Sequence, residues 1–298
     1  MILALWLAMW AAPGGSATPR ENDACAGLGE AKASIRAGDL PSAQRSLEAC
    51  VVARPRSAEA WLDLGLVHFA QQHLDEAATA LEKSLELDAR QPRTCKMLGR
   101  VQTARAKPDL AERAFAEAAR LDPRDAESRY LLGRLYQSQN RLVEAARLLK
   151  EAVALDPGSV RAHAFLGTVS YALGDQTLAE ESFRRATFLS QASTRPDAIP
   201  HLEYGIYLQR TNRLEESVAE LRRAAELDRS SAEASFELGQ SLYRLRRSKE
   251  AREALEQALS RDPADARVHY LLGRVCYEQG DRACGDEQMR LSEKQRGR

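Results

Sequence analysis

The amino-acid sequence predicts an all-α protein, built as a solenoid of helix-turn-helix repeats, on three grounds. The 298 residues are 44% hydrophobic and 6% aromatic, a composition that argues against collagen-like and low-complexity chains. Glycines recur at a constant spacing, and in each unit two stretches of apolar residues at helical spacing flank a break at Gly, Asn or Asp. One helical hairpin cannot bury its own apolar face, so such units have to stack.

The repeat is marked by glycines that form two series, each with a step of 34 residues. The first series is Gly65, Gly99, Gly133 and Gly167, and the second is Gly205, Gly239 and Gly273. The series are offset by 38 residues, which places four extra residues near 190–200. A small residue follows each glycine after twelve positions, and an apolar residue follows it after sixteen. Small residues at the crossing of two helices let their backbones approach closely.

Two repeats carry the pattern most fully. The second repeat has Trp61, Leu64, Gly65, Ala77 and Leu81. The fourth has Leu132, Gly133, Tyr136, Ala145, Ala152 and Pro157. These residues resemble the tetratricopeptide repeat (TPR), whose pattern is W-x₂-L-G-x₂-Y…A-x₃-F…P. The resemblance covers essentially everything after the first residues, and it implies a right-handed α-solenoid of TPR repeats.

Eight repeats fit the chain in this register. They are predicted at 24–57, 58–91, 92–125, 126–159, 160–197, 198–231, 232–265 and 266–298. Repeats 1–5 thus occupy 24–197 and repeats 6–8 occupy 198–298, in one continuous solenoid. The segment 189–200 holds the four extra residues and two prolines, so we expect a longer helix or loop there, and a kink that divides the stack into five repeats and three.

The N-terminal residues 1–12 form an uncharged apolar run, which is shorter than the roughly 20 residues that a membrane-spanning helix needs. The run is typical of the hydrophobic region of a secretory signal, and Gly15 and Ala17 offer a cleavage site, although no Lys or Arg precedes it. We therefore expect a signal peptide at 1–17, a linker at 18–23 and a secreted or periplasmic protein. The alternative is a wrongly assigned start of a cytoplasmic protein. No later segment is uncharged over a membrane-spanning length.

Charge and motifs exclude several classes of function. Lys+Arg and Asp+Glu number 43 each, so the chain has no net charge that attracts nucleic acid. The common nucleotide-binding, hydrolase and zinc-protease motifs are absent from the sequence. His163, His201 and His269 lie in different repeats and cannot share one metal ion. The sequence therefore predicts no enzyme, no cofactor and no metal site.

The cysteines are placed by the repeat so that two pairs can form. Cys25 and Cys50 are at positions 2 and 27 of the first repeat, and Cys276 and Cys284 are at positions 11 and 19 of the last. In an antiparallel hairpin, neighbours across the two helices have a nearly constant sum of positions, and these sums are 29 and 30. We expect two disulfides in an oxidising compartment; the alternative is reduced, buried cysteine. Cys95 is at an interior position and is predicted to be core.

A binding surface follows from the resemblance, because in TPR proteins positions 2, 5, 9 and 12 of the first helices line a concave groove. Here those positions combine aromatic residues with arginine, as binding hot spots do. The predicted peptide-binding residues are Lys96, Arg100, Tyr130, Arg134, Arg161, Tyr171, Phe236, Tyr243, Tyr270 and Arg274. They predict a protein or peptide partner that is acidic or bound by its carboxyl terminus. The alternative is that each Tyr packs against the neighbouring repeat and each Arg is merely solvated.

The function predicted from the sequence is a non-enzymatic, exported TPR scaffold that binds proteins or peptides in its groove. One alternative is an exported protein in which Cys276 and Cys284 perform thiol–disulfide exchange or redox sensing. That role needs a thiolate of low pKa, and the sequence places no His, Lys or helix N-terminus clearly beside either cysteine. A second alternative is a cytosolic TPR regulatory adaptor.

Overall fold

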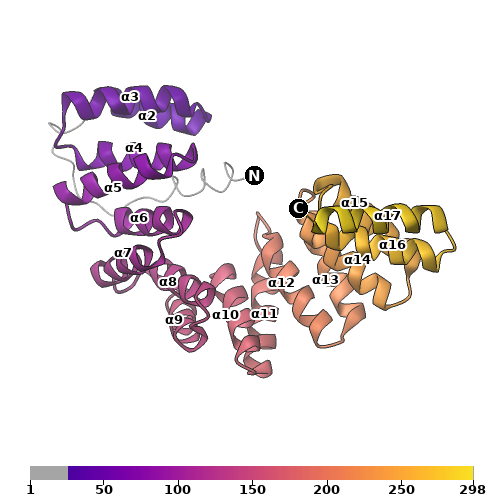
Figure 1. Ribbon diagram of the computed structural model, residues 1–298. Coiled ribbons are helices and arrows are strands. Elements are labelled where there is room, and N and C mark those ends of the chain that lie inside the picture. The colour runs from indigo at the N-terminus through magenta and orange to yellow at the C-terminus, as the bar shows by residue number, and fades with distance from the viewer. Residues whose placement is uncertain (1–25, 298) are drawn as a thin grey trace. The chain divides into compact units, whose positions relative to one another are not determined.

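The structure, a computed structural model, describes residues 26–297 as helices joined by short turns, with no strand in that range (Figure 1). The chain divides into two compact units after Gln139. The first unit contains α2 (Ala26–Ala37), α3 (Leu40–Ala53), α4 (Ala58–Ala70), α5 (Leu74–Leu87), α6 (Pro92–Ala104), α7 (Pro108–Leu121) and α8 (Ala126–Ser138). The predicted all-α fold of helix-turn-helix repeats is confirmed.

The second unit continues the same alternation of a first and a second helix. It contains α9 (Leu142–Leu155), α10 (Val160–Ala172), α11 (Gln176–Gln191), α12 (Ala198–Arg210), α13 (Leu214–Leu227), α14 (Ala232–Arg244), α15 (Ser248–Arg261), α16 (Ala266–Glu278) and α17 (Arg282–Arg296). The first helices α4, α6, α8, α10, α12, α14 and α16 begin at the first residues of predicted repeats 2–8.

The extra residues near 190–200 lie inside the second unit. They lengthen α11 to 16 residues, and a connection then leads to α12. Ser190 and Asp197 hold the ends of this connection together, because the Ser190 hydroxyl donates to the Asp197 carbonyl and accepts from its N–H, both at 2.9 Å. A division of the stack at this place stays a prediction.

Each turn between a first and a second helix contains one residue with positive φ, in the left-handed region. Glycine or asparagine supplies it in five repeats, at Gly38, Asn140, Gly174, Asn212 and Gly280. In the other three repeats Gln72, Ala106 and Arg246 take up the same conformation, with φ of 55–65°. L-residues with a Cβ adopt this conformation at a cost of roughly 1 kcal/mol, so the packing of the two helices enforces it there.

Within each compact unit, the two helices of a repeat with a marker glycine meet at that glycine. A Cβ on Gly205 would lie 2.6 Å from Cγ of Leu221, and a Cβ on Gly99 would lie 2.4 Å from the ring of Phe115. Leu221 and Phe115 are themselves buried. The last repeat is looser, because a Cβ on Gly273 would lie 3.3 Å from the flexible side chain of Met289.

The helices that matter most below, α14 and α16, begin at side-chain caps. Ser231 Oγ accepts from the N–H of Ala234 at 3.1 Å, and Asp265 Oδ1 accepts from the N–H of Arg267 at 2.8 Å. Such caps satisfy N–H groups that the first turn leaves without partners. They therefore fix where each helix starts and which side chains its face presents.

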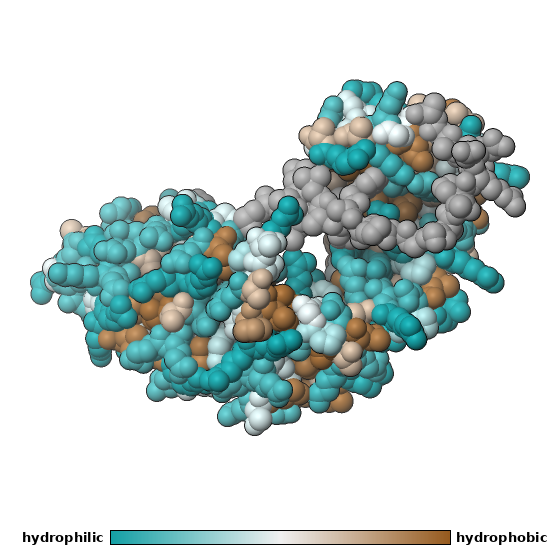
Figure 2. All heavy atoms as spheres, turned by 180° about the vertical axis from the view of Figure 1, so that it is seen from behind, coloured by the Kyte–Doolittle hydropathy of each residue, from teal (hydrophilic) through white to brown (hydrophobic). Residues whose placement is uncertain are grey.

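The surface seen in Figure 2 is mainly hydrophilic, with apolar side chains in small, separate patches. Large exposed apolar residues such as Val52, Val143 and Phe188 lie on different helices. Within residues 26–297, no helix combines the length and the apolar character that crossing a bilayer requires.

Replacing the marker glycines should separate the tight repeats from the loose one. Gly205→Ala is expected to lower the free energy of unfolding by about 1–2 kcal/mol, because steric overlap with Leu221 outweighs the gain in helix propensity. Gly273→Ala is the matched control and should leave the stability unchanged or raise it by up to about 1 kcal/mol. Thermal and urea unfolding measure both. Equal effects of the two substitutions would contradict the close approach at Gly205.

Candidate peptide-binding site

Two of the three predicted cations of the first unit are paired with carboxylates at the start of α8. Lys96 Nζ lies 3.0 Å from Asp125 Oδ2 and 2.7 Å from Glu127 Oε2. Arg100 Nη2 lies 2.6 Å from Glu127 Oε1. Burial lowers the pKa of Lys96, but the two carboxylates outweigh it and raise the pKa overall. An anionic ligand here would have to displace Glu127.

The other two predicted residues of the first unit stack on one another. Tyr130 is only 7% exposed, and the guanidinium of Arg134 lies 5.7 Å from the centre of its ring. Arg134 and Arg100 line a hollow of about 300 Å³ on α6, α7 and α8. Tyr130 thus follows the alternative prediction, in which the tyrosine is largely a packing residue.

In the second unit, Arg161 and Tyr171 on α10 both contact the following repeat. Arg161 Nε lies 3.2 Å from Asp197 Oδ2. The Tyr171 ring meets the Tyr207 ring edge-on, with centroids 5.2 Å apart. Both side chains are half-buried. Each of them therefore has a structural partner within the stack.

The remaining predicted residues do come together, at the end of the second unit. Phe236 and Tyr243 on α14, and Tyr270 and Arg274 on α16, line one pocket of about 540 Å³. Arg274 lies 5.1 Å from the centre of the Tyr243 ring and 6.0 Å from that of Tyr270. The structure thus brings four predicted groove residues from two repeats into one concave site.

Three further arginines line this site. Arg244, at the end of α14, is held by the chain itself, because it donates to the carbonyl of Gln209 and to Asn212 Oδ1, both at 2.9 Å. Arg267, from the first turn of α16, lies 4.6 Å from the centre of the Phe236 ring, and Arg296, from the last turn of α17, lies 5.3 Å from that of Tyr270. We call these residues the arginine–aromatic pocket; its members are Phe236, Tyr243, Arg267, Tyr270, Arg274 and Arg296. Arg296 was missed by the sequence analysis because it comes from a second helix, whereas the groove positions belong to first helices.

The arginines of the pocket differ in how they are neutralised. Arg267 is paired with Glu233 and with Asp265, both at 2.8 Å. Arg274 and Arg296 have aromatic rings beside them, and no carboxylate of residues 26–297 forms an ion pair with either. Glu237 also lines the pocket; it is half-buried, and desolvation raises the pKa of its carboxyl. The pocket therefore carries excess positive charge at Arg274 and Arg296.

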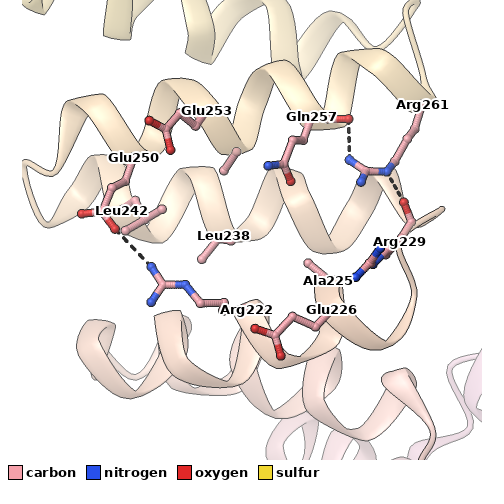
Figure 3. A pocket seen from close by; sticks show the side chains of 11 residues that line it. Arg222, Ala225, Glu226, Arg229, Leu238, Leu242, Glu250, Glu253, Gln257 and Arg261 are labelled. Carbon is pink, nitrogen blue, oxygen red and sulfur yellow. Dashed lines mark hydrogen bonds and ion pairs between the residues drawn. The ribbon is translucent and has the colours of Figure 1, made fainter.

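A second hollow of the same unit, of about 420 Å³, lies on α13, α14 and α15 (Figure 3). Its charged side chains are engaged with one another and with the backbone. Arg222 Nη2 lies 3.1 Å from Glu250 Oε2, and Arg261 donates to the carbonyls of Arg229 and Gln257 (Figure 3). The bonds from Arg222 and to Arg229 join neighbouring repeats, so we interpret this hollow as part of the interface between two repeats and not as a binding site.

Comparison with known proteins shows the family to which this chain belongs. The tetratricopeptide repeat family profile matches residues 28–92, 96–160, 134–194, 202–254 and 237–283. The chain belongs to the tetratricopeptide repeat family. TPR proteins are protein-interaction scaffolds and are typically not enzymes. No curated protein sequence matches this chain.

Solved TPR structures share the fold. A chain of the APC/C hetero-tetramer Cut9–Hcn1 superposes with a TM-score of 0.69 at 19% identity, over 81% of this chain and 49% of that one. A TPR protein from Parabacteroides merdae gives 0.66 at 17% identity, over 84% and 97%. MamA from Desulfovibrio magneticus gives 0.52 at 23% identity, over 56% and 95%. The TPR chain thus spans about half the length of the first of these, and the likeness is one of fold.

The described cysteines of the TPR chain include one bonded pair and one free, buried thiol. Cys276 and Cys284 have their sulfur atoms 2.10 Å apart and their Cα atoms 5.9 Å apart, as the predicted pair requires. The pairing of Cys25 with Cys50 stays a prediction, because Cys25 lies outside the described residues. Cys95 is buried and unpaired, and desolvation raises the pKa of its thiol to about 11.

One expectation about these cysteines was wrong. The sequence analysis found no helix N-terminus clearly beside Cys276 or Cys284. In the structure Cys284 is in the first turn of α17, and its N–H donates to the capping carboxylate of Asp281 at 3.1 Å. The two sulfur atoms and a carboxylate oxygen of Asp281 lie within 4.8 Å of one another. Metal ligation by cysteine needs a thiolate, and these two sulfur atoms are bonded to each other, so the group is a disulfide rather than a metal site.

The first unit also holds a buried acid that the sequence analysis did not single out. Asp63 on α4 is 1% exposed, and its Oδ2 lies 3.9 Å from Lys32 Nζ. Desolvation raises the pKa of Asp63 to about 7, although the Lys32 charge opposes the shift. The neighbouring Glu59, which also pairs with Lys32, is exposed.

This acid should make the stability of the TPR chain depend on pH. Because the pKa of Asp63 is raised on folding from 3.8 to about 7, its protonation stabilises the fold below about pH 4, and that contribution is lost as the pH rises through 7. Asp63→Asn should therefore be more stable than the parent at pH 8, by on the order of 3 kcal/mol, with the difference vanishing towards pH 4. Unfolding at several pH values measures this. Glu59→Gln is the control, and the same pH trend in Glu59→Gln would contradict the role of Asp63.

Proposed function

We propose that this chain is an exported scaffold that binds an acidic segment of a partner protein, or its carboxyl terminus, in the arginine–aromatic pocket. The observation that carries the proposal is the convergence of Arg274 and Arg296 on aromatic rings, while neither forms an ion pair with a carboxylate of the described residues, Glu237 of the pocket lining included. A guanidinium that already lies on a ring can still donate to a carboxylate. A ligand carboxylate would therefore gain charge-assisted hydrogen bonds without displacing an internal partner.

The size and lining of the pocket suit a short segment of chain. A volume of about 540 Å³ is within the range of sites that enclose a small ligand. Tyr270 is 40% exposed and Tyr243 is half-buried, so their rings can cover an apolar side chain of the ligand. Tyrosine and arginine are also the residues that most often carry the binding energy of an interface.

The rest of the predicted groove contributes less to this proposal. Lys96, Arg100 and Arg161 are each paired with a carboxylate of the next repeat. A ligand that binds there exchanges one ion pair for another, which yields little net free energy. The binding of an acidic ligand is therefore assigned to α14, α16 and α17 rather than spread evenly along all first helices.

Charge reversal in the pocket should abolish binding of an acidic peptide. With a fluorescent peptide of Glu and Phe that has a free carboxyl terminus, Arg274→Glu should weaken binding in anisotropy titrations by roughly tenfold or more. Arg290→Glu is the matched control, because Arg290 is an exposed residue of α17 that does not line the pocket. It should bind within about twofold of the parent. No binding by the parent, or equal loss in both variants, would refute the assignment.

Export rests on the N-terminal sequence and on the cysteine pair. Residues 1–17 have the apolar run and the small residues of a cleaved secretory signal. Cys276 and Cys284 lie at bonding distance, which suits an oxidising compartment. The alternative, a cytosolic TPR adaptor, follows if residues 1–17 result from a wrongly assigned start.

N-terminal sequencing of the protein purified from the cells that make it separates these two locations. Export predicts a mature chain that begins at Thr18, recovered from the secreted or periplasmic fraction. Protein that begins at Met1 and is recovered from the cytoplasm would exclude the exported scaffold. Fractionation alongside a known cytoplasmic enzyme controls for leakage.

A further inference from the structure

The two cysteines of the last repeat differ in their access to solvent. Cys276, on α16, is 0% exposed, whereas Cys284, in the first turn of α17, is half-buried. A thiolate attacks a disulfide along the axis of the sulfur–sulfur bond, so it must reach one sulfur from the outside. Only the Cys284 side of this pair is open to such an attack. The asymmetry is the first of three observations that together assign a role to the pair.

The second observation concerns α17, which buries fewer residues than the other second helices. In the preceding repeat α15 buries Ala251, Ala254, Leu255 and Ala258. In α17 only Gly285 and Ser292 are buried, and Met289, which takes the place of Leu255, is half-buried. Little apolar area is therefore removed from water when α17 packs, and its link through Cys284 becomes important for its attachment.

Beside the contacts of Met289 with Gly273 and of the Tyr277 ring with Gly285, hydrogen bonds attach α17 to α16. Ser292 Oγ donates to the carbonyl of Ala266 at 2.9 Å, and Gln288 Oε1 lies 2.7 Å from Nδ1 of His269. Hydrogen bonds of this kind each contribute only about 1 kcal/mol net. A covalent link between α16 and α17 restricts the chain far more when few other contacts do so.

The third observation is that α17 reaches the arginine–aromatic pocket. Arg296, in its last turn, stacks on Tyr270 of α16 at 5.3 Å. The position of Arg296 depends on α17 lying against α16. The state of the cysteine pair at one end of α17 therefore bears on a pocket residue at the other end.

We propose that Cys284 is a thiol-exchange site and that its bond to Cys276 is a reducible latch, which holds α17 on α16 and so keeps Arg296 in the pocket. The proposed co-reactant is a small thiol. Its thiolate attacks Sγ of Cys284, a bond forms between these two sulfur atoms, and the bond to Cys276 breaks. The electron pair of that bond leaves with Cys276 Sγ, which takes up a proton. A second thiolate then attacks the sulfur of the first reagent, so that the reagents leave as their disulfide and Cys284 is released.

The charges around Cys284 suit this sequence. Cys284 leaves as a thiolate at the N-terminus of α17, where the helix dipole stabilises negative charge. The carboxylate of Asp281 opposes that charge, but Asp281 is itself bonded to Arg252, whose Nη1 lies 3.2 Å from Asp281 Oδ2. The other hydrogen bonds that Arg252 makes, to Glu256 and Gln279, keep it at this end of the helix.

Trapping the mixed disulfide tests the exchange site directly. The full chain is treated with limiting glutathione, quenched with an alkylating reagent and mapped by mass spectrometry. Glutathione on Cys284 with the alkyl group on Cys276 is the expected product. Glutathione on Cys276, or an intact bond under conditions that reduce a solvent-exposed model disulfide, would overturn the proposal.

Hydrogen exchange tests the latch. On reduction, or in the variant Cys276→Ser/Cys284→Ser, the amides of α17 should exchange roughly tenfold faster or more. The amides of α15 are the internal control and should change little. Unchanged exchange in α17 would overturn the latch, even where the mixed disulfide forms. If the whole chain loses protection in the variant, the reduced parent protein decides.

The effect on binding rests on the proposed function and is measured separately. Reduction should lower the affinity for the acidic peptide only because Arg296 is displaced. The variant Arg296→Gln should therefore bind the peptide with the same affinity in both redox states. A peptide that never binds refutes the pocket but leaves the exchange and latch results standing. Equal binding by the oxidised and the reduced parent would show that the latch does not control the pocket.

Discussion

The approach of two helix backbones at a glycine is the contact on which the rest of this structure depends. A Cβ on Gly205 would lie 2.6 Å from Cγ of Leu221. The equivalent distances are 2.7 Å from Gly65 to Leu81 and 2.7 Å from Gly239 to Leu255. A contact this close permits one crossing geometry, and that geometry sets where the next repeat begins. The 34-residue step of the sequence is the consequence, because each repeat must present an equivalent face to its neighbour.

The same constraint explains the strained turns. Once the two helices are fixed at the glycine, the turn between them must reverse the chain within a set number of residues. The backbone at that place is left-handed whether the residue is Gly174, Asn212 or Ala106. The unfavourable conformational free energy at Ala106 is offset by the apolar surface that α6 and α7 bury against each other. The proposed pocket and the cysteine pair involve the last repeat, where this regularity relaxes, because Gly273 and Met289 pack more loosely there.

The parts of the structure that could be predicted are those that repeat. The glycine series predicted the all-α fold class and the first residues of the first helices. It did so because periodicity averages over the weak signal of each single residue. The turn residues Gln72, Ala106 and Arg246 could not be recognised by type, since their conformation is imposed by the register. The same limit applies to Arg296, which reaches the pocket from a helix that the groove pattern does not include.

Charge pairing was the other feature that single positions did not reveal. Arginine and glutamate are abundant everywhere in this chain, and most pairs that matter join residues about one repeat apart. Arg213 with Glu180, Arg246 with Glu278 and Arg267 with Glu233 are examples, at 2.8–3.0 Å. Such pairs need both the repeat register and the side-chain direction, so a basic stripe such as Lys96 and Arg100 looked like a site for anions although Glu127 already neutralises it.

This pairing also gives the net charge of zero a physical meaning. A stack that neutralises its own arginines from repeat to repeat has little long-range attraction for any charged partner. Specificity then depends on the few cations for which the neighbouring repeat supplies no carboxylate. Arg274 and Arg296 are of this kind within residues 26–297, and aromatic rings lie where the carboxylates would otherwise be. A local excess of charge on a neutral scaffold selects a partner at short range, through contact geometry, rather than by attraction from afar.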